Sequence, residues 1–150
     1  MRTLILLKPD GVQRGLIGEI VLRFEKKGLK IVAMKMMRMT KEKAEDFYFV
    51  HKGKPFYNGL VEYITSGPIV AVCLDGNDDI ITVVRTMMGK TNPAEAEKGT
   101  IRADYGVDIG KNTVHGSDSE ESAKKEIPIV FDEKDFLGYK RIDKEWVYEK

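Results

Sequence analysis

The chain has 150 residues, of which 42% are hydrophobic and 33% charged, and its 25 basic and 24 acidic residues leave a net charge of +1. This length and composition predict one domain over residues 1–150 with a real core, because domains commonly hold about 100–150 residues. The balanced charge argues against a primary nucleic-acid partner, since binding to a phosphate backbone requires a basic excess or stripe.

Apolar periodicity predicts seven elements before residue 90. In chain order they are a strand, a helix, a strand, two helices, a strand and a helix: Thr3–Leu7, Gly15–Lys27, Lys30–Met39, Lys41–Val50, Pro55–Ser66, Pro68–Leu74 and Asp78–Met88. Thr40 is a suitable N-cap for the helix that follows it. The first apolar run is too short for a signal peptide, and no run reaches the roughly 18 residues of a membrane helix, so we expect no membrane partner.

The only cysteine, Cys73, lies in the third predicted strand. We interpret it as a buried packing residue rather than a nucleophile. A lone cysteine excludes an internal disulfide and a Cys-rich zinc site, and it indicates a reducing, cytoplasmic location.

The segment Thr91–Gly110 is predicted to be mostly irregular, because prolines and glycines interrupt it. Loops of this length are uncommon in compact domains and are usually functional or disordered. A strand at Thr113–His115, a helix from Asp118 and an aromatic-containing tail over Tyr139–Lys150 follow. The tail is expected to pack on its own domain or on a neighbouring subunit. The order β-α-β-α-α-β-α-β indicates an α/β fold of the α+β sandwich kind, with a ferredoxin-like split β-α-β core.

The segment around His115 is the strongest functional signal. Gly116 permits a sharp turn, and Ser117 with Glu120 has the Ser-x-x-Glu spacing of a capping box, which predicts a helix start. Helix N-termini favour anions, so this histidine is suited to act as nucleophile or proton carrier beside a phosphate. A surface histidine, or one satisfied by hydrogen bonds, is the alternative interpretation.

Standard nucleotide-binding loops are absent from the sequence. Gly89-Lys90-Thr91 resembles the end of a Walker A loop, but Val84 occupies the position of the required earlier glycine. No G-x-G-x-x-G, H-E-x-x-H or zinc-deaminase pattern occurs. What remains is a dispersed set of groups suited to phosphate: Lys8, Arg85, Thr91, Arg102 and His115. Phosphoryl transfer needs mainly positioning and charge stabilisation, although basic residues like these are most often solvated surface.

The pattern Asn-x-x-His-Gly-Ser-Asp-Ser-x-x-Ser-Ala resembles the active-site signature of the nucleoside diphosphate kinases, and the resemblance extends over nearly the whole chain. The matching motifs occur in the expected order: Leu7–Val12 with Arg14-Gly15, Pro55–Val61, Ser66–Pro68, Gly89–Ala94, Gly99–Arg102 and Asn112–Ala123. The resemblance implies an α/β sandwich with a four-stranded antiparallel sheet.

The resemblance also implies residue roles. His115 would take the γ-phosphate of a nucleoside triphosphate and pass it to a nucleoside diphosphate, with Glu126 and Ser117 orienting its imidazole. The implied nucleotide-binding residues contact phosphate (Lys8, Tyr48, Arg85, Thr91, Arg102), ribose (Lys8, Asn112) and base (Phe56, Ile109), with Leu60 in the same site. Stacking on a base tolerates any base, which suits an enzyme with little base discrimination.

Mg²⁺ is the implied cofactor, held mainly by the nucleotide and water, with no protein metal ligand. The implied assembly is a homo-oligomer. The long C-terminal tail resembles that of hexameric members of the family, so the resemblance implies a hexamer. Lys54 and Lys98 stand where many members have Arg and Pro, which leaves the stabilising role of the loop at Lys98 in doubt.

Alternatives remain on the residues alone. Phe56 and Tyr48 equally suit core packing, and we interpret His51 as a surface residue. A binding module that lost its chemistry is disfavoured, because the histidine and the cations are present. A histidine phosphocarrier that accepts from a protein would have no use for a base site at Phe56 and Ile109.

Overall fold

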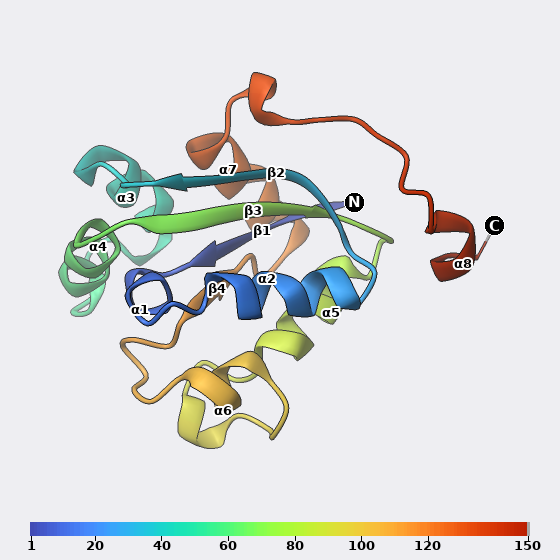
Figure 1. The fold of residues 1–150 in the computed structure, drawn as a ribbon. Coiled ribbons are helices and arrows are strands. Elements are labelled where there is room, and N and C mark those ends of the chain that lie inside the picture. The colour runs from blue at the N-terminus through green and yellow to red at the C-terminus, as the bar shows by residue number, and fades with distance from the viewer. Residues whose placement is uncertain (150) are drawn as a thin grey trace.

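The computed structural model describes residues 1–149 and forms a four-stranded antiparallel sheet covered by helices on both faces (Figure 1). The strands are β1 Arg2–Leu7, β2 Lys30–Met37, β3 Ile69–Asp75 and β4 Val114–Gly116. The helices are α1 Pro9–Gln13, α2 Ile17–Lys26, α3 Lys41–Phe47, α4 Tyr57–Thr65, α5 Ile80–Met88, α6 Ile101–Tyr105, α7 Glu120–Val130 and α8 Lys144–Val147, with short 3-10 turns at Phe49–His51, Pro93–Glu95 and Glu133–Asp135.

The sheet order is β2-β3-β1-β4, and every neighbouring pair is antiparallel. This confirms the predicted α+β sandwich. β1 lies in the middle and pairs with β3 on one side and with the three-residue β4 on the other, where Leu6 faces His115. The end of β1 therefore delivers Lys8 next to the segment that carries His115.

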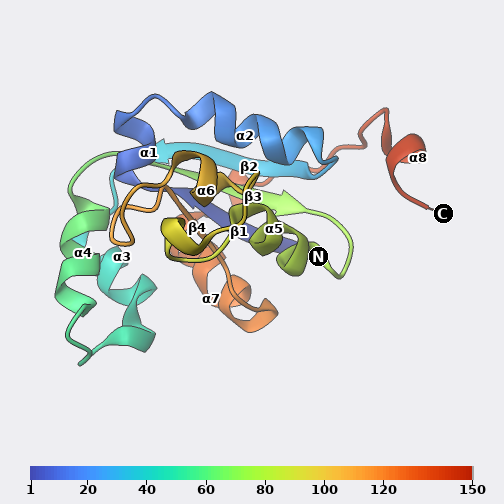
Figure 2. The ribbon, with the colours of Figure 1, turned by 90° about the horizontal axis from the view of Figure 1, so that it is seen from below.

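Two hydrophobic clusters lie on opposite faces of the sheet. Successive residues of β1 alternate between them, so that Leu4 and Leu6 join one cluster while Ile5 and Leu7 join the other. α3, α4 and α7 cover the first face, and α2, α5 and α6 cover the second (Figures 1 and 2). Because both faces are covered, the central strands read as continuous apolar runs rather than alternating ones. Cys73 is fully buried in β3, and burial raises the pKa of its thiol to about 12.

One local prediction was wrong. Ser117 does not cap a helix: Ser119 is the N-cap of α7, and its Oγ accepts from the Ser122 amide at 3.0 Å. β1 ends at Leu7 as predicted, and Pro9 begins α1, since proline is well tolerated in the first turn of a helix. The segment predicted to be mostly irregular also contains the short helix α6, whose N-cap Thr100 accepts a hydrogen bond from the Ala103 amide.

The predicted N-cap Thr40 is confirmed, because its hydroxyl accepts from the Lys43 amide. The C-terminal segment projects from the body of the domain (Figure 1). It touches the domain where the Tyr148 hydroxyl donates to the Gly28 carbonyl at 2.8 Å, yet Trp146 is 91% exposed. No helix within residues 1–149 has the length and apolarity needed to cross a bilayer.

Candidate active site

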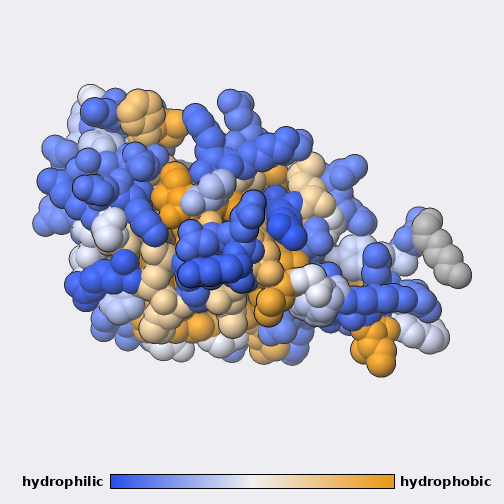
Figure 3. All heavy atoms as spheres, turned by 90° about the horizontal axis from the view of Figure 1, so that it is seen from above, coloured by the Kyte–Doolittle hydropathy of each residue, from blue (hydrophilic) through white to orange (hydrophobic). Residues whose placement is uncertain are grey.

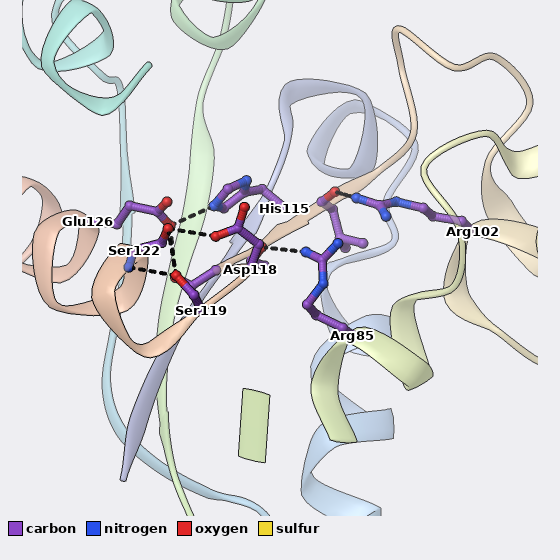
Figure 4. A network of polar contacts seen from close by, with 10 residues as sticks. Arg85, Arg102, His115, Asp118, Ser119, Ser122 and Glu126 are labelled. Carbon is purple, nitrogen blue, oxygen red and sulfur yellow. Dashed lines mark hydrogen bonds and ion pairs between the residues drawn. The ribbon is translucent and has the colours of Figure 1, made fainter. Parts of the chain in front are cut away.

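His115 lies on β4 and is fixed by a carboxylate from α7. Its Nε2 atom lies 2.8 Å from Oε1 of Glu126, and the buried Ser117 donates its hydroxyl to the same oxygen at 2.8 Å (Figure 4). An ionised carboxylate only accepts hydrogen bonds, so Nε2 must carry the proton. The lone pair of the neutral imidazole is therefore on Nδ1. The contact with Glu126 thus engages Nε2 and not Nδ1.

Phe47 and Tyr48, at the end of α3, pack beside the imidazole. The Phe47 ring stands edge-to-face to His115, with centroids 4.9 Å apart, and Tyr48 stands edge-to-face to Phe47. Burial raises the pKa of the Tyr48 phenol, and the nearby Glu126 carboxylate raises it further, so Tyr48 stays protonated. A cavity of about 330 Å³ opens here between the α3 end and α7, and His115 and Glu126 are among its lining residues.

Two arginines lie on the other side of β4 (Figure 4). Arg102 is buried and donates to the Val114 carbonyl at 2.8 Å and to the Gly89 carbonyl at 3.0 Å. Arg85, on α5, donates to the Gly116 carbonyl at 3.2 Å. Burial and the neighbouring Arg85 charge lower the pKa of Arg102 to about 10. Within residues 1–149 both guanidinium groups donate to backbone carbonyls and neither forms an ion pair with a carboxylate, so both positive charges are available to an anion.

Lys8 and Asn112 meet although 104 residues separate them. The Lys8 ammonium donates to Oδ1 of Asn112 at 2.8 Å, and the Asn112 amide donates to the Thr91 carbonyl at 2.9 Å. Burial, with a smaller effect of the Arg102 charge, lowers the pKa of Lys8 to about 8, although the Asp10 charge opposes the shift. An anion that entered the site would stabilise the charged form of Lys8.

Phe56 and Ile109 are the two residues expected at the base, and Leu60 is expected in the same nucleotide site. Phe56 is 50% exposed and Ile109 is 55% exposed, and neither lines the cavity beside His115. Leu60 is partly buried against the hydrophobic core. The expectation that His51 is a surface residue was wrong: it is half-buried, it lines the cavity with His115, and its ring lies 5.3 Å from the Phe56 ring.

Three residues near the site were not predicted from the sequence: Phe47, Asp10 and Asp118. Asp118 is exposed beside the N-terminus of α7, and its pKa is lowered chiefly by the hydroxyl of Ser122, with smaller effects from Ser119, Arg85 and His115. Its place in the pattern that follows His115 was a signal for it. Phe47 and Asp10 lie far from His115 in sequence, and the tertiary fold brings Phe47 to the imidazole and Asp10 to the Thr113 amide.

Comparison with known proteins supports this arrangement. A family model described as nucleoside diphosphate kinase matches residues 1–136. The chain is 53% identical to a nucleoside diphosphate kinase of Archaeoglobus fulgidus over 149 residues, covering 99% of this chain and 98% of the relative. It is 57% identical to one of Staphylothermus marinus over 138 residues, covering 92% and 97%.

Solved structures give the same picture. The structure of the Halobacterium salinarum nucleoside diphosphate kinase in complex with CDP matches with a TM-score of 0.96 at 48% identity, covering 99% of both chains. The Aquifex aeolicus nucleoside diphosphate kinase matches with a TM-score of 0.87 at 47% identity, covering 91% of this chain and 98% of that one.

Proposed function

Because this chain belongs to the nucleoside diphosphate kinase family, we propose that His115 carries the phosphoryl group that it transfers from nucleoside triphosphates to nucleoside diphosphates. The observation that supports this most directly is the protonated Nε2 bound to Glu126, which leaves the Nδ1 lone pair free. A histidine nucleophile needs no separate base when it is neutral at pH 7.

In the first half-reaction Nδ1 attacks the γ-phosphorus. The Nδ1–P bond forms, the bond from phosphorus to the bridging oxygen breaks, and the nucleoside diphosphate leaves with that electron pair. Phosphorylation places positive charge on the imidazole, which the Glu126 carboxylate stabilises through Nε2. Ser117 holds the carboxylate oxygen in place. The second half-reaction reverses these steps with a different nucleoside diphosphate.

The nucleotide lies across the cations and Asn112. Arg85 and Arg102 bind phosphate oxygens and stabilise charge in the transition state, as phosphoryl transfer requires. Lys8, Tyr48 and Thr91 complete the phosphate contacts. Lys8 with Asn112 also holds the ribose hydroxyls, and their mutual hydrogen bond preorganises the pair. CDP in the Halobacterium salinarum structure supports a diphosphate-binding site of this kind.

The base stacks between Phe56 and Ile109, and Leu60 belongs to the same nucleotide site. Phe56 and Ile109 are both half-exposed, so both side chains are available to contact a base. Stacking does not discriminate strongly among bases.

Mg²⁺ is the implied cofactor, and when bound with the nucleotide it would neutralise part of the charge of the phosphates. No group of three potential metal-binding side chains occurs in the described residues 1–149, and Asp118, whose pKa the Arg85 charge helps to lower, is exposed. This donor set fits an ion held chiefly by phosphate oxygens and water.

The chain acts as one domain over residues 1–150 and assembles into a homo-oligomer, by analogy of its tail a hexamer. Hydrophobic atoms are exposed on the projecting part of the molecule (Figure 3). Ile142 in the tail is 99% exposed, which supports an assembly that covers it. The buried thiol of Cys73 supports a reducing, cytoplasmic location.

Brief incubation with γ-labelled ATP tests the role of His115. The protein should acquire an acid-labile label that GDP then removes, and His115→Ala should acquire none. His51→Ala, which removes the only other histidine, is the matched control and should still be labelled. Label that persists on His115→Ala, or that GDP does not remove, would contradict the mechanism. Removal by GDP also separates this enzyme from a protein-fed phosphocarrier.

A further inference from the structure

Thr113, two residues before His115, has an unusual backbone conformation. Its φ is +71°, and within residues 1–149 it alone among non-glycine residues has a positive φ. The Val114 amide donates to the Asn112 carbonyl at 2.8 Å, so the three residues form a γ-turn centred on Thr113. A γ-turn with positive φ is rare and strained, and such strain persists only where the surrounding structure enforces it.

Asp10 and Lys8 supply that enforcement from the end of β1. The Thr113 amide donates to Oδ2 of Asp10 at 3.0 Å, and the Thr113 carbonyl accepts from the Lys8 amide at 2.8 Å. Both peptide groups of the strained residue are therefore held. Gly11 allows this close approach, because a Cβ there would lie 3.2 Å from the Thr113 carbonyl oxygen.

Tyr63 fixes the Asp10 carboxylate in turn. The Tyr63 hydroxyl donates to Oδ1 of Asp10 and accepts from the Asp10 amide at 2.9 Å. Both oxygens of the carboxylate are thus committed, one to α4 and one to the turn. The side chain of Asp10 has no freedom to serve another partner.

We propose that Asp10 is a positioning residue for phosphoryl transfer, which acts by holding Thr113 in its strained turn. This inference rests on the proposed function of His115. The turn sets Asn112 on one side and His115 on the other. If Thr113 relaxed to a negative φ, the adjacent peptides would rotate, Asn112 would move from Lys8, and His115 would move relative to Glu126.

A purely structural role for Asp10 is the competing explanation. Asp10 lies in the first turn of α1, where an acidic side chain interacts favourably with the helix dipole. In that role Asp10 would be important for folding, and the effect of losing it would not depend on the residue at position 113. The two explanations therefore differ in whether a change at Thr113 compensates for loss of Asp10.

Glycine adopts a positive φ without a steric penalty, so Thr113→Gly removes the strain that Asp10 opposes. In single-turnover labelling with saturating ATP, we expect Asp10→Ala to slow phosphorylation of His115 by about tenfold, the scale of one strained residue. Asp10→Ala with Thr113→Gly should recover most of that rate. Asp10→Ala with Thr113→Ala is the matched control, because it loses the hydroxyl but keeps the Cβ, and it should stay slow.

Tyr63→Phe is a milder variant, for use if Asp10→Ala unfolds. It removes only the hydroxyl that holds the Asp10 carboxylate. Adding Thr113→Gly to Tyr63→Phe should likewise restore the rate of phosphorylation. Equal rates for the glycine and alanine double variants, or an unslowed Asp10→Ala, would overturn the proposal. If wild-type protein takes no label, the proposed function fails instead. The crystal structure of Asp10→Ala then still decides the positioning claim, which requires φ of Thr113 to turn negative and is overturned if it stays positive.

Discussion

The ring of Phe47 stands at 69° to the imidazole of His115, with the two centroids 4.9 Å apart. Phe47 is 6% exposed, so it closes one side of the histidine to water. With Glu126 at Nε2, this leaves the imidazole with one polar and one aromatic support.

Phe47→Leu should therefore loosen the histidine and admit water. Aromatic pairs are worth about 0.5–1.5 kcal/mol beyond buried area, which converts to a two- to tenfold slower phosphorylation if it is lost in the transition state. Hydrolysis of the phosphoenzyme without acceptor should rise. Both rates are measured with γ-labelled ATP. Tyr139→Leu, at a half-exposed aromatic residue that does not line the cavity of His115, should change neither.

Glu126→Gln removes the charge opposite the phosphorylated imidazole. By comparison with loss of an electrostatic donor in other enzymes, the labelling rate should fall by about 10²-fold. Ser117→Ala should cost less, about tenfold, because a hydrogen bond to a charged group is worth about 1.5–3 kcal/mol. Since both act on one oxygen, the double variant should lose less than the product of the two effects. Glu121→Gln, on an exposed part of the same helix, is the control.

Nucleotide affinity should weaken above pH 8 because of Lys8. Its folded pKa is about 8, below the unfolded value of 10.5, so it loses its charge as pH rises between these values. Anion binding needs the charged form, and the Kd of ADP measured by calorimetry should rise accordingly. The unfolding free energy should move the opposite way, rising with pH over this window, because the unfolded chain then holds more protons. Lys8→Met should abolish both dependences, whereas the exposed Lys124→Met should preserve them.

Phe56→Ala tests the base site. Loss of a stacking platform costs about 1–3 kcal/mol, so the Kd of every nucleoside diphosphate should rise by roughly 5- to 150-fold. The labelling rate at saturating ATP should change little, because Phe56 does not line the cavity of His115. Tyr139→Ala removes another half-exposed ring, outside the cavity of His115, as a control. An unchanged Kd for Phe56→Ala would show that the base does not bind against Phe56.

The strands were predictable because β1 and β3 are buried on both faces and their apolar runs are unbroken. The helices α1 and α6 were not, since each has five residues and is stabilised by packing rather than by a periodic pattern. The N-cap of α7 was assigned two residues early, because Ser117 and Ser119 both suit a helix start. The Glu126 carboxylate decides between them, since it engages the Ser117 hydroxyl.

The candidate site followed from its motifs, but its internal contacts did not. The pairing of Lys8 with Asn112 and the approach of Phe47 to His115 depend on which strands are neighbours. A threonine in the sequence gives no sign of the positive φ that Thr113 adopts in its strained turn. Such features arise from tertiary constraint, which overrides local preference.

The order of these residues along the chain has a consequence during synthesis. Lys8 leaves the ribosome early, but its partner Asn112 and the carboxylate of Glu126 follow more than a hundred residues later. The central strand β1 must wait for β4 before its second edge is paired. A growing chain therefore holds no assembled phosphate site until translation has passed α7, so an incomplete copy cannot consume nucleoside triphosphates through it.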